Sequence, residues 1–402
     1  MTHNSQRVKV GIISTPIAPF TSVSTGYRLA RLVGADQFWL GDHSKGLFPA
    51  QMWNKQLTSA ARLAPSPDAY FEPTVVLARL AGRSRMQLGT SVTDSVRRSA
   101  ADLARTWLTL HHATGGRAIL GIGSGEKQNI EAYGASLERS VSRLEETVRA
   151  VRAAWSSEGE LIDFDGQWTK WNRARFALPP YKNTVPPIWL AAQGPRTLRI
   201  TGTYCDGWIG PDDGCGPQVW AQRAARVAAA AQAAGKDVEK FDFACMVLTL
   251  LAPDRHRLRE LLSHPVMGYL ALLFPDSAWQ QVGLEHPLGR GSLGLPDLEY
   301  DELNVDQIRS ITKDLTEELF HSAFYTGTGK DVARRLEPII DAGARHIMLL
   351  DMTSVAGLAA AARAQLETLH LVRRLRQMTP GRVSVGPLDP AKYPVETSVN
   401  SG

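Results

Sequence analysis

The chain has 402 residues, of which 44% are hydrophobic, so it is long enough to bury a large core. No apolar run approaches the ~20 residues of a membrane span, and the start MTHNSQRVKV lacks the apolar stretch of a secretory signal, so we expect a cytoplasmic protein without a membrane span. The net charge is only +5 and includes no basic run, which argues against nucleic-acid binding and permits an anionic small-molecule ligand.

Eight short β-rich runs recur along the chain, each bounded by Gly, Ser or Asp. They are VKVGIIS from Val8, FWLGD from Phe38, MQLGTSV from Met86, AILGIGSG from Ala118, IWLAAQG from Ile188, DGWIG from Asp206, FDFACMVLTL from Phe241 and HIMLLD from His346. Between most of them lie helical patterns such as RSVSRLEETVRAVRAAW, whose apolar residues share one face (Val141, Leu144, Val148, Val151 and Trp155). This alternation, repeated eight times, predicts a closed (β/α)8 (TIM) barrel; an open doubly wound sheet is the alternative.

Three connections are longer than ordinary loops, and they follow the second, fourth and seventh strands. They cover about residues 43–70, 156–181 and 253–320 of a single barrel domain over residues 1–378. Long insertions in a barrel usually build substrate pockets, so we expect function there. The second insertion contains GELIDFDGQWTKW, which predicts a hairpin with Asp-Gly at its turn. The tail, residues 379–402, is rich in Pro, Gly and Ser and is expected to be extended or disordered, unless it packs on a partner subunit.

Polar residues follow five of the predicted strands directly. Asp42 and His43 follow the second, and the others are Ser91, Thr93, Ser124, Glu126, Gln193, Asp212 and Asp213. The carboxyl ends of barrel strands share one rim, where catalytic groups converge, so His43 and Glu126 are candidate acid/base residues. Simpler interpretations remain open: Asp42 as a helix cap, His43 as a surface histidine, and Glu126 as an acid at a helix N-terminus.

Small residues after two neighbouring strands predict a slot for a planar ring with a charged tail. GIGSGE contributes Gly121, Gly123 and Gly125, and AAQGP contributes Ala191, Ala192 and Gly194. A tight turn would explain the first set equally well. In SVRRSAAD, Arg97 and Arg98 precede a Ser99–Asp102 capping box and suit a phosphate, although two solvated arginines are the alternative. The three cysteines, Cys205, Cys215 and Cys245, lack metal-ligand spacing, so we expect reduced thiols and no metal site.

The motifs together resemble the luciferase-like flavin and deazaflavin oxidoreductases, in the branch that uses coenzyme F420. The resemblance covers nearly the whole chain and is carried by ADQFWLGDH, LGTSVTD, GGRAILGIGSGE with Asn129, PPIWLAAQGPRTLRITGTYCDGWI and YTGTGKDVARRLEPIIDAGARHIML. The likeness is closest to the phthiodiolone ketoreductases, through VGADQFWLGDH, VTDSVRR, SRLEETVRAVRAAWSSEGEL and GLEHPLG. GLEHPLG is the most specific match because it lies inside an insertion.

The resemblance implies roles for individual residues. His43 would be the acid/base beside the deazaflavin, and Glu126 a second one if burial raises its pKa. Ser91 and Val92 match a bulge that often contains a cis peptide. With the arginines and the slot, the predicted cofactor contacts are Asp42, Ser91, Val92, Thr93, Arg97, Arg98, Gly125, Glu126, Asn129, Ala191, Ala192, Gln193 and Gly194. Leu47, Asp212 and Asp213 depart from the sugar-phosphate dehydrogenases of this branch, so glucose 6-phosphate is not the expected substrate.

The predicted reaction is hydride transfer between coenzyme F420 and a carbonyl or alcohol carbon, in the manner of a ketoreductase. Aromatic and apolar residues in and near the insertions, such as Trp53, Phe71, Trp279 and VMGYLALLF from Val266, favour a bulky apolar substrate, although core packing explains them equally well. We expect a homodimer. Two alternatives remain: an FMN-dependent luciferase-like monooxygenase, and a non-catalytic flavin-binding protein.

Overall fold

Eight parallel strands form a closed barrel in the computed structural model, which describes residues 7–384 except 47, 83–84, 213, 293, 295–302, 304 and 314. The strands are β1 (Lys9–Ser14), β2 (Gln37–Leu40), β3 (Gln87–Thr90), β5 (Ala118–Gly123), β8 (Ile188–Ala191), β9 (Gly207–Asp212), β10 (Asp242–Leu251) and β12 (His346–Asp351). Each pairs with the next, and β12 pairs with β1, which closes the ring. The predicted (β/α)8 barrel is confirmed, and the open-sheet alternative is wrong.

Large side chains fill the inside of the barrel. Trp39 and Trp189 are fully buried with ring centroids 5.2 Å apart. Gly11 and Gly89 make room for Trp39, because a Cβ would lie 2.6 Å from its ring at Gly11 and 2.4 Å at Gly89. A filled interior of this kind is a packed core and leaves function to the strand ends.

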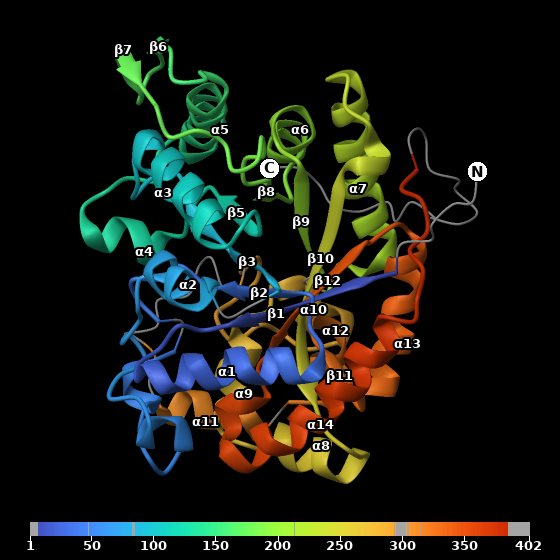
Figure 1. Ribbon diagram of the computed structural model, residues 1–402. Helices are drawn as coiled ribbons and strands as arrows, with labels where there is room; N and C mark the ends of the chain where they lie inside the picture. The colour runs from blue at the N-terminus through green and yellow to red at the C-terminus, as the bar shows by residue number, and fades with distance from the viewer. Residues whose placement is uncertain are drawn as a thin grey trace.

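Helices surround the barrel, as Figure 1 shows. The eight that follow the barrel strands are α1 (Phe20–Val33), α2 (Pro73–Ala81), α3 (Ala100–Ala113), α5 (Ser140–Ser156), α6 (Pro195–Tyr204), α7 (Gly216–Ala233), α13 (Gly329–Asp341) and α14 (Leu358–Leu375). The predicted apolar face of α5 is confirmed, since Leu144, Val148, Val151 and Trp155 are buried. Among the described helices, none is long and apolar enough to cross a membrane.

The second insertion forms the predicted hairpin, β6 (Leu161–Asp165) and β7 (Lys170–Arg175), which lies outside α5 in Figure 1. Glu146 of α5 accepts backbone N–H bonds from Gln167, Trp168 and Thr169 at 2.7, 2.8 and 2.5 Å. One nearly buried carboxylate therefore fixes the whole hairpin loop on the barrel.

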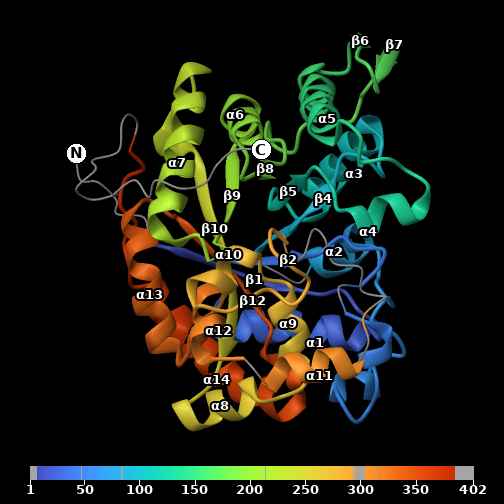
Figure 2. The same ribbon diagram turned by 180° about the vertical axis from the view of Figure 1, so that it is seen from behind.

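The first and third insertions share a second apolar core, and Figure 2 shows two helices of the third insertion, α9 (Val266–Leu272) and α11 (Val305–Lys313), side by side. The first contributes two 3₁₀ turns, η1 (Ala50–Met52) and η2 (Ser59–Arg62). The third contributes α8 (Arg255–Leu262), α9 (Val266–Leu272), α10 (Asp276–Gln281), α11 (Val305–Lys313) and the start of α12 (Glu317–Ala323). A short strand, β11 (Tyr325–Gly327), follows this insertion and was not predicted. Every residue of α9 is buried, and Phe48 packs on Tyr269 with ring centroids 5.4 Å apart.

The start of the tail, residues 379–384, has no helix or strand but packs against the end of α13. Gly381 donates a backbone hydrogen bond to Ile340 at 2.9 Å, and Val383 is buried. Residues 385–402 lie outside the described part of the chain.

Asp351 at the end of β12 gives the fold a pH-dependent element. Burial raises the pKa of its carboxyl to about 6, although Thr249 and Thr353 donate hydrogen bonds to Oδ1 at 3.1 and 2.7 Å. The unfolded chain releases this proton near pH 3.9, so the native state binds more protons between about pH 4 and 6, and the free energy of unfolding falls as pH rises through that window.

Asp351→Asn removes this ionisation and keeps the acceptor oxygen. We expect the variant to be more stable than the wild type by about 1–3 kcal/mol at pH 7.5 and close to it near pH 4, as measured by urea unfolding at both pH values. An equal difference at the two pH values would show that Asp351 does not titrate between them.

Candidate active site at the carboxyl end of the barrel

The Asp42 side chain is buried at the end of β2 and accepts three polar contacts. Thr93 Oγ1 donates to Asp42 Oδ2 at 2.6 Å, Arg98 lies 3.0 Å from the same oxygen, and Arg97 lies 3.3 Å from Oδ1. Asp42 therefore joins an ion-pair network, and the helix-cap interpretation is wrong.

Arg97 fixes the loop that carries His43. Its guanidinium donates to the Asp42 carbonyl at 2.6 Å, to Ser44 Oγ at 2.9 Å and to the Asp94 carboxylate. Arg98 also pairs with Glu72 at 2.8 Å. The interpretation of Arg97 and Arg98 as merely solvated is therefore wrong, since both are held by carboxylates; their role toward a cofactor phosphate stays a prediction.

His43, Asn129 and Glu126 meet beside this network. Asn129 Nδ2 lies 2.9 Å from His43 Nδ1 and 3.0 Å from Glu126 Oε2, while His43 Nδ1 lies 3.3 Å from that carboxylate oxygen. The His43 side chain is 15% exposed, and its ring packs edge-on against Tyr70 at 5.6 Å. Glu126 precedes the short helix α4 (Lys127–Ile130) but makes no capping hydrogen bond with its side chain. The two candidate acid/base residues are thus brought together.

The charge on Glu126 differs from the sequence expectation. Loss of water around the carboxylate opposes ionisation, but the charge of His43 and hydrogen bonds from His43 and Asn129 outweigh it and lower the pKa of Glu126. The condition that burial raises this pKa is not met, so Glu126 is an ionised acceptor at neutral pH. Burial and the nearby carboxylates Glu126 and Asp68 raise the pKa of Tyr70, which keeps its proton.

Residues of the predicted slot and of the third-strand bulge lie close together. The peptide between Ser91 and Val92 is cis, as expected, and β3 resumes beyond it as β4 (Thr93–Asp94), which pairs with β5. A Cβ at Gly123 would lie 3.0 Å from Val92 and 4.0 Å from Ala191, so these three residues pack together at the inner core of the barrel. Their role as a cofactor slot stays a prediction.

A family model described as luciferase-like monooxygenase matches residues 5–346. The chain belongs to this family. It is 35% identical over 353 residues to a phthiodiolone/phenolphthiodiolone dimycocerosates ketoreductase of Mycobacterium kansasii, which covers 87% of the chain and 96% of that protein. It is 25% identical over 340 residues to a 5,10-methylenetetrahydromethanopterin reductase of Methanolobus tindarius, with 84% of the chain and 92% of the relative covered. These relatives are reductases, and the chain is accordingly an oxidoreductase.

Solved structures confirm the luciferase-like barrel. A coenzyme F420-dependent tetrahydromethanopterin reductase from Methanopyrus kandleri superposes with a TM-score of 0.68 at 17% identity, covering 92% of this chain and 99% of that one. The oxygenating constituent of 3,6-diketocamphane monooxygenase from Pseudomonas putida, in complex with FMN, gives 0.64 at 15% identity and covers 93% and 99%.

Four other predicted cofactor contacts of this luciferase-like chain have local structural surroundings of their own. Gly125 has φ +98° and a Cβ there would lie 2.1 Å from Ile130, as a tight turn requires. Ala192 packs in the outer core, where its carbonyl accepts a hydrogen bond from Trp208 at 2.8 Å. Gln193 and Gly194 are exposed. The cofactor roles of these four residues stay predictions.

The polar residues after β9 form a separate structural contact. Asp212 is buried, accepts a hydrogen bond from Tyr325 and another from the Gly216 amide at 3.2 Å, and thereby holds β11 beside β9. Asp213 and Leu47, which also carried the argument against glucose 6-phosphate, lie outside the described residues. No group of His, Cys, Asp and Glu in the described part of the chain is placed to hold a metal ion.

Three residues of the site were not predicted. Tyr70 packs on the His43 ring, while Asp94 and Glu72 pair with the two arginines. Only Asp94 had a signal in the sequence, since it directly follows Thr93 at the rim. In the structure, its Oδ1 accepts hydrogen bonds from the backbone amides of Val96 and Arg97 at 2.8 and 2.7 Å.

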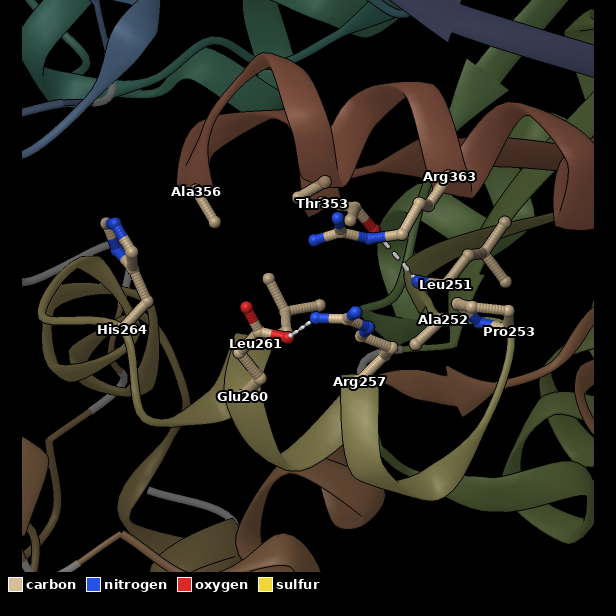
Figure 3. A pocket seen from close by; sticks show the side chains of 11 residues that line it. Leu251, Ala252, Pro253, Arg257, Glu260, Leu261, His264, Thr353, Ala356 and Arg363 are labelled. Atoms are coloured by element: carbon tan, nitrogen blue, oxygen red, sulfur yellow. Dashed lines mark hydrogen bonds and ion pairs between the residues drawn. The ribbon is translucent and has the colours of Figure 1, made fainter.

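A different cavity lies outside the barrel between α8 and α14, and Figure 3 shows it from close by. Its polar side chains include Arg257, Glu260 and Arg363, and the Arg257–Glu260 pair is solvent-exposed. None of the predicted site residues lines it, so it is not the acid/base site.

Proposed function

We propose that the protein is a coenzyme F420-dependent oxidoreductase that interconverts a ketone and an alcohol on a bulky, largely apolar substrate. The observation that carries this proposal is the placement of His43 Nδ1 within 2.9 Å of Asn129 and 3.3 Å of ionised Glu126 at the carboxyl rim of the barrel. The ketoreductase and methanopterin reductase relatives support a reductase reaction of this kind.

The residues present fit a flat cofactor ring. Val92, Gly123 and Ala191 present only small apolar groups, and a side chain at Gly123 would crowd Val92, with its Cβ at 3.0 Å. Coenzyme F420 supplies or receives an electron pair as hydride at one ring carbon. The protein must then hold the substrate carbon at that ring and manage one proton at the substrate oxygen.

His43 manages that proton in the proposed mechanism. In reduction the substrate carbon gains a C–H bond, the carbonyl π pair moves to oxygen, and oxygen takes a proton from Nε2 of the protonated ring. Glu126 accepts the Nδ1–H hydrogen bond while the ring is charged, for which its lowered pKa suits it. After the transfer, exchange with water moves the proton of the neutral ring from Nδ1 to Nε2. In alcohol oxidation each step runs in reverse.

The apolar surroundings favour a bulky substrate. Phe48 packs on Trp53 and on Tyr269, each with centroids 5.4 Å apart, and so joins the first insertion to the third above the strand ends. These rings also serve the second core, so they support the substrate class less strongly than His43 supports the chemistry. The homodimer and the cytoplasmic location stay predictions.

Separate titrations with coenzyme F420 and FMN test the cofactor. Binding is measured by the quenching of each ligand's fluorescence. We expect micromolar or tighter binding of F420 and much weaker binding of FMN. Turnover is then measured with long-chain ketones and with glucose 6-phosphate as the control substrate, which we expect not to react. Preference for FMN would instead favour the luciferase-like monooxygenase, which the FMN-bound structural neighbour keeps as the second candidate.

A further inference from the structure

Asn129 uses every hydrogen-bonding position of its amide group. The side chain is buried, with the residue 2% exposed. Its Oδ1 accepts the backbone N–H groups of Ser44 and Lys45 at 2.7 and 3.0 Å. Its Nδ2 lies 2.9 Å from His43 Nδ1 and 3.0 Å from Glu126 Oε2. An amide has two donor hydrogens and two acceptor lone pairs, so nothing is left for a cofactor.

The two backbone amides fix which way the amide group points. Reversing the amide would place its NH₂ group 2.7 and 3.0 Å from the backbone N–H groups of Ser44 and Lys45, where two donors would repel each other. The group that faces His43 Nδ1 is therefore the NH₂ donor. A donor at 2.9 Å requires an acceptor opposite, so Nδ1 of the neutral ring carries no hydrogen.

We infer that Asn129 is a positioning residue that sets the tautomer of His43, so that the neutral ring carries its proton on Nε2. Among the described residues no hydrogen bond uses Nε2, which leaves this N–H to donate to a substrate oxygen. The catalytic meaning of this inference rests on the proposed function, but the tautomer itself does not. It also changes the predicted role of Asn129 from a cofactor contact to a support of His43.

Glu126 serves the other protonation state of the same nitrogen. Its Oε2 lies 3.3 Å from Nδ1, so a protonated ring has a carboxylate to which Nδ1–H is donated. The other groups near the ring are Tyr70, Asp42, and Arg97, which binds the Asp42 carbonyl and Ser44. Asn129 thus favours the neutral ring and Glu126 favours the charged one.

The tautomer is measured by NMR on protein labelled with ¹⁵N-histidine, without cofactor or substrate, with His43→Ala to assign the signals. We expect neutral His43 to show hydrogen on Nε2 and none on Nδ1. In Asn129→Asp an oxygen replaces the donor, so we expect the proton of the neutral ring on Nδ1 and a ring that stays charged to higher pH than in the wild type, because the new carboxylate stabilises the charge. Hydrogen on Nδ1 of neutral His43 in the wild type would overturn the inference, whether or not the variant folds.

Asn54→Asp is the matched control. Asn54 Oδ1 also accepts two backbone amides, from Gln56 and Leu57 at 3.1 and 3.0 Å. Within the described part of the chain, its Nδ2 donates a hydrogen bond to the Gln51 carbonyl alone, at 3.5 Å. We expect this variant to leave the His43 NMR signals unchanged. A change in these signals equal to that in Asn129→Asp would contradict the inference.

A second readout separates this inference from the proposed function. With coenzyme F420 and a ketone, we expect Asn129→Asp to move the pH–rate profile to higher pH in the same direction as the NMR titration. The expected tautomer without any turnover would refute the function and leave the tautomer standing. Turnover by a wild-type protein whose neutral His43 carries hydrogen on Nδ1 would support the function and refute the inferred tautomer.

Discussion

His43→Ala is expected to slow the chemical step by about 10²- to 10⁴-fold, the contribution typical of a general acid–base residue. The affinity for coenzyme F420 should change by less than about threefold, because the predicted contacts to the ring and tail of the cofactor lie elsewhere. The imidazole is held by Asn129 at 2.9 Å, so its loss removes a positioned proton carrier and leaves the loop amides on Asn129 Oδ1. Single-turnover kinetics with bound cofactor measure the step, and fluorescence titration measures the affinity.

The control is His112→Ala. His112 is bonded to the Pro179 carbonyl at 2.8 Å on the outside of α3, and we expect little change in rate. Glu126→Gln is the companion variant, since it keeps the shape and removes the charge. A large loss in Glu126→Gln with His43→Ala nearly silent would move the proton role to Glu126, and silence in both would return the pair to a structural role.

The fold was predictable because barrel strands have a local signal. The eight continuous apolar runs became the eight barrel strands, and the predicted run from Phe241 differs from β10 by one residue at each end. The convergence of His43 and Glu126 followed from the same geometry, since parallel strands end at one rim. β11 was missed because three residues, Tyr325–Gly327, are too few to show a periodic pattern.

The partners of the polar residues were not predictable. Asp42 and Arg97 are 55 positions apart in sequence, and His43 and Asn129 are 86 apart, so no local spacing shows that they touch. The lowered pKa of Glu126 depends on the same contacts. Residue types at the rim indicated where chemistry lies, whereas the charge states needed the three-dimensional neighbours.

Asp42→Ala is expected to lower the free energy of unfolding by about 3–5 kcal/mol, because it leaves two poorly solvated guanidinium groups without a shared carboxylate. The Asp42 side chain is 4% exposed, and those of Arg97 and Arg98 are 17% and 27% exposed. Thr93 also loses its acceptor at 2.6 Å. Urea unfolding followed by circular dichroism measures the change.

Asp36→Ala is the matched control at the other end of the barrel. Asp36 also pairs with two arginines, Arg7 at 2.6 Å and Arg376 at 3.9 Å, but their side chains are 41% and 37% exposed. Because water solvates these cations, we expect a loss of only about 1 kcal/mol. Adding Arg98→Met to Asp42→Ala removes one of the two guanidinium groups that lose Asp42. Its other partner, Glu72, is 39% exposed and is then solvated by water, so the double variant should restore about 1 kcal/mol. Equal losses for Asp42→Ala and Asp36→Ala, with no recovery in the double variant, would mean that burial of the ion pairs does not set their contribution to stability.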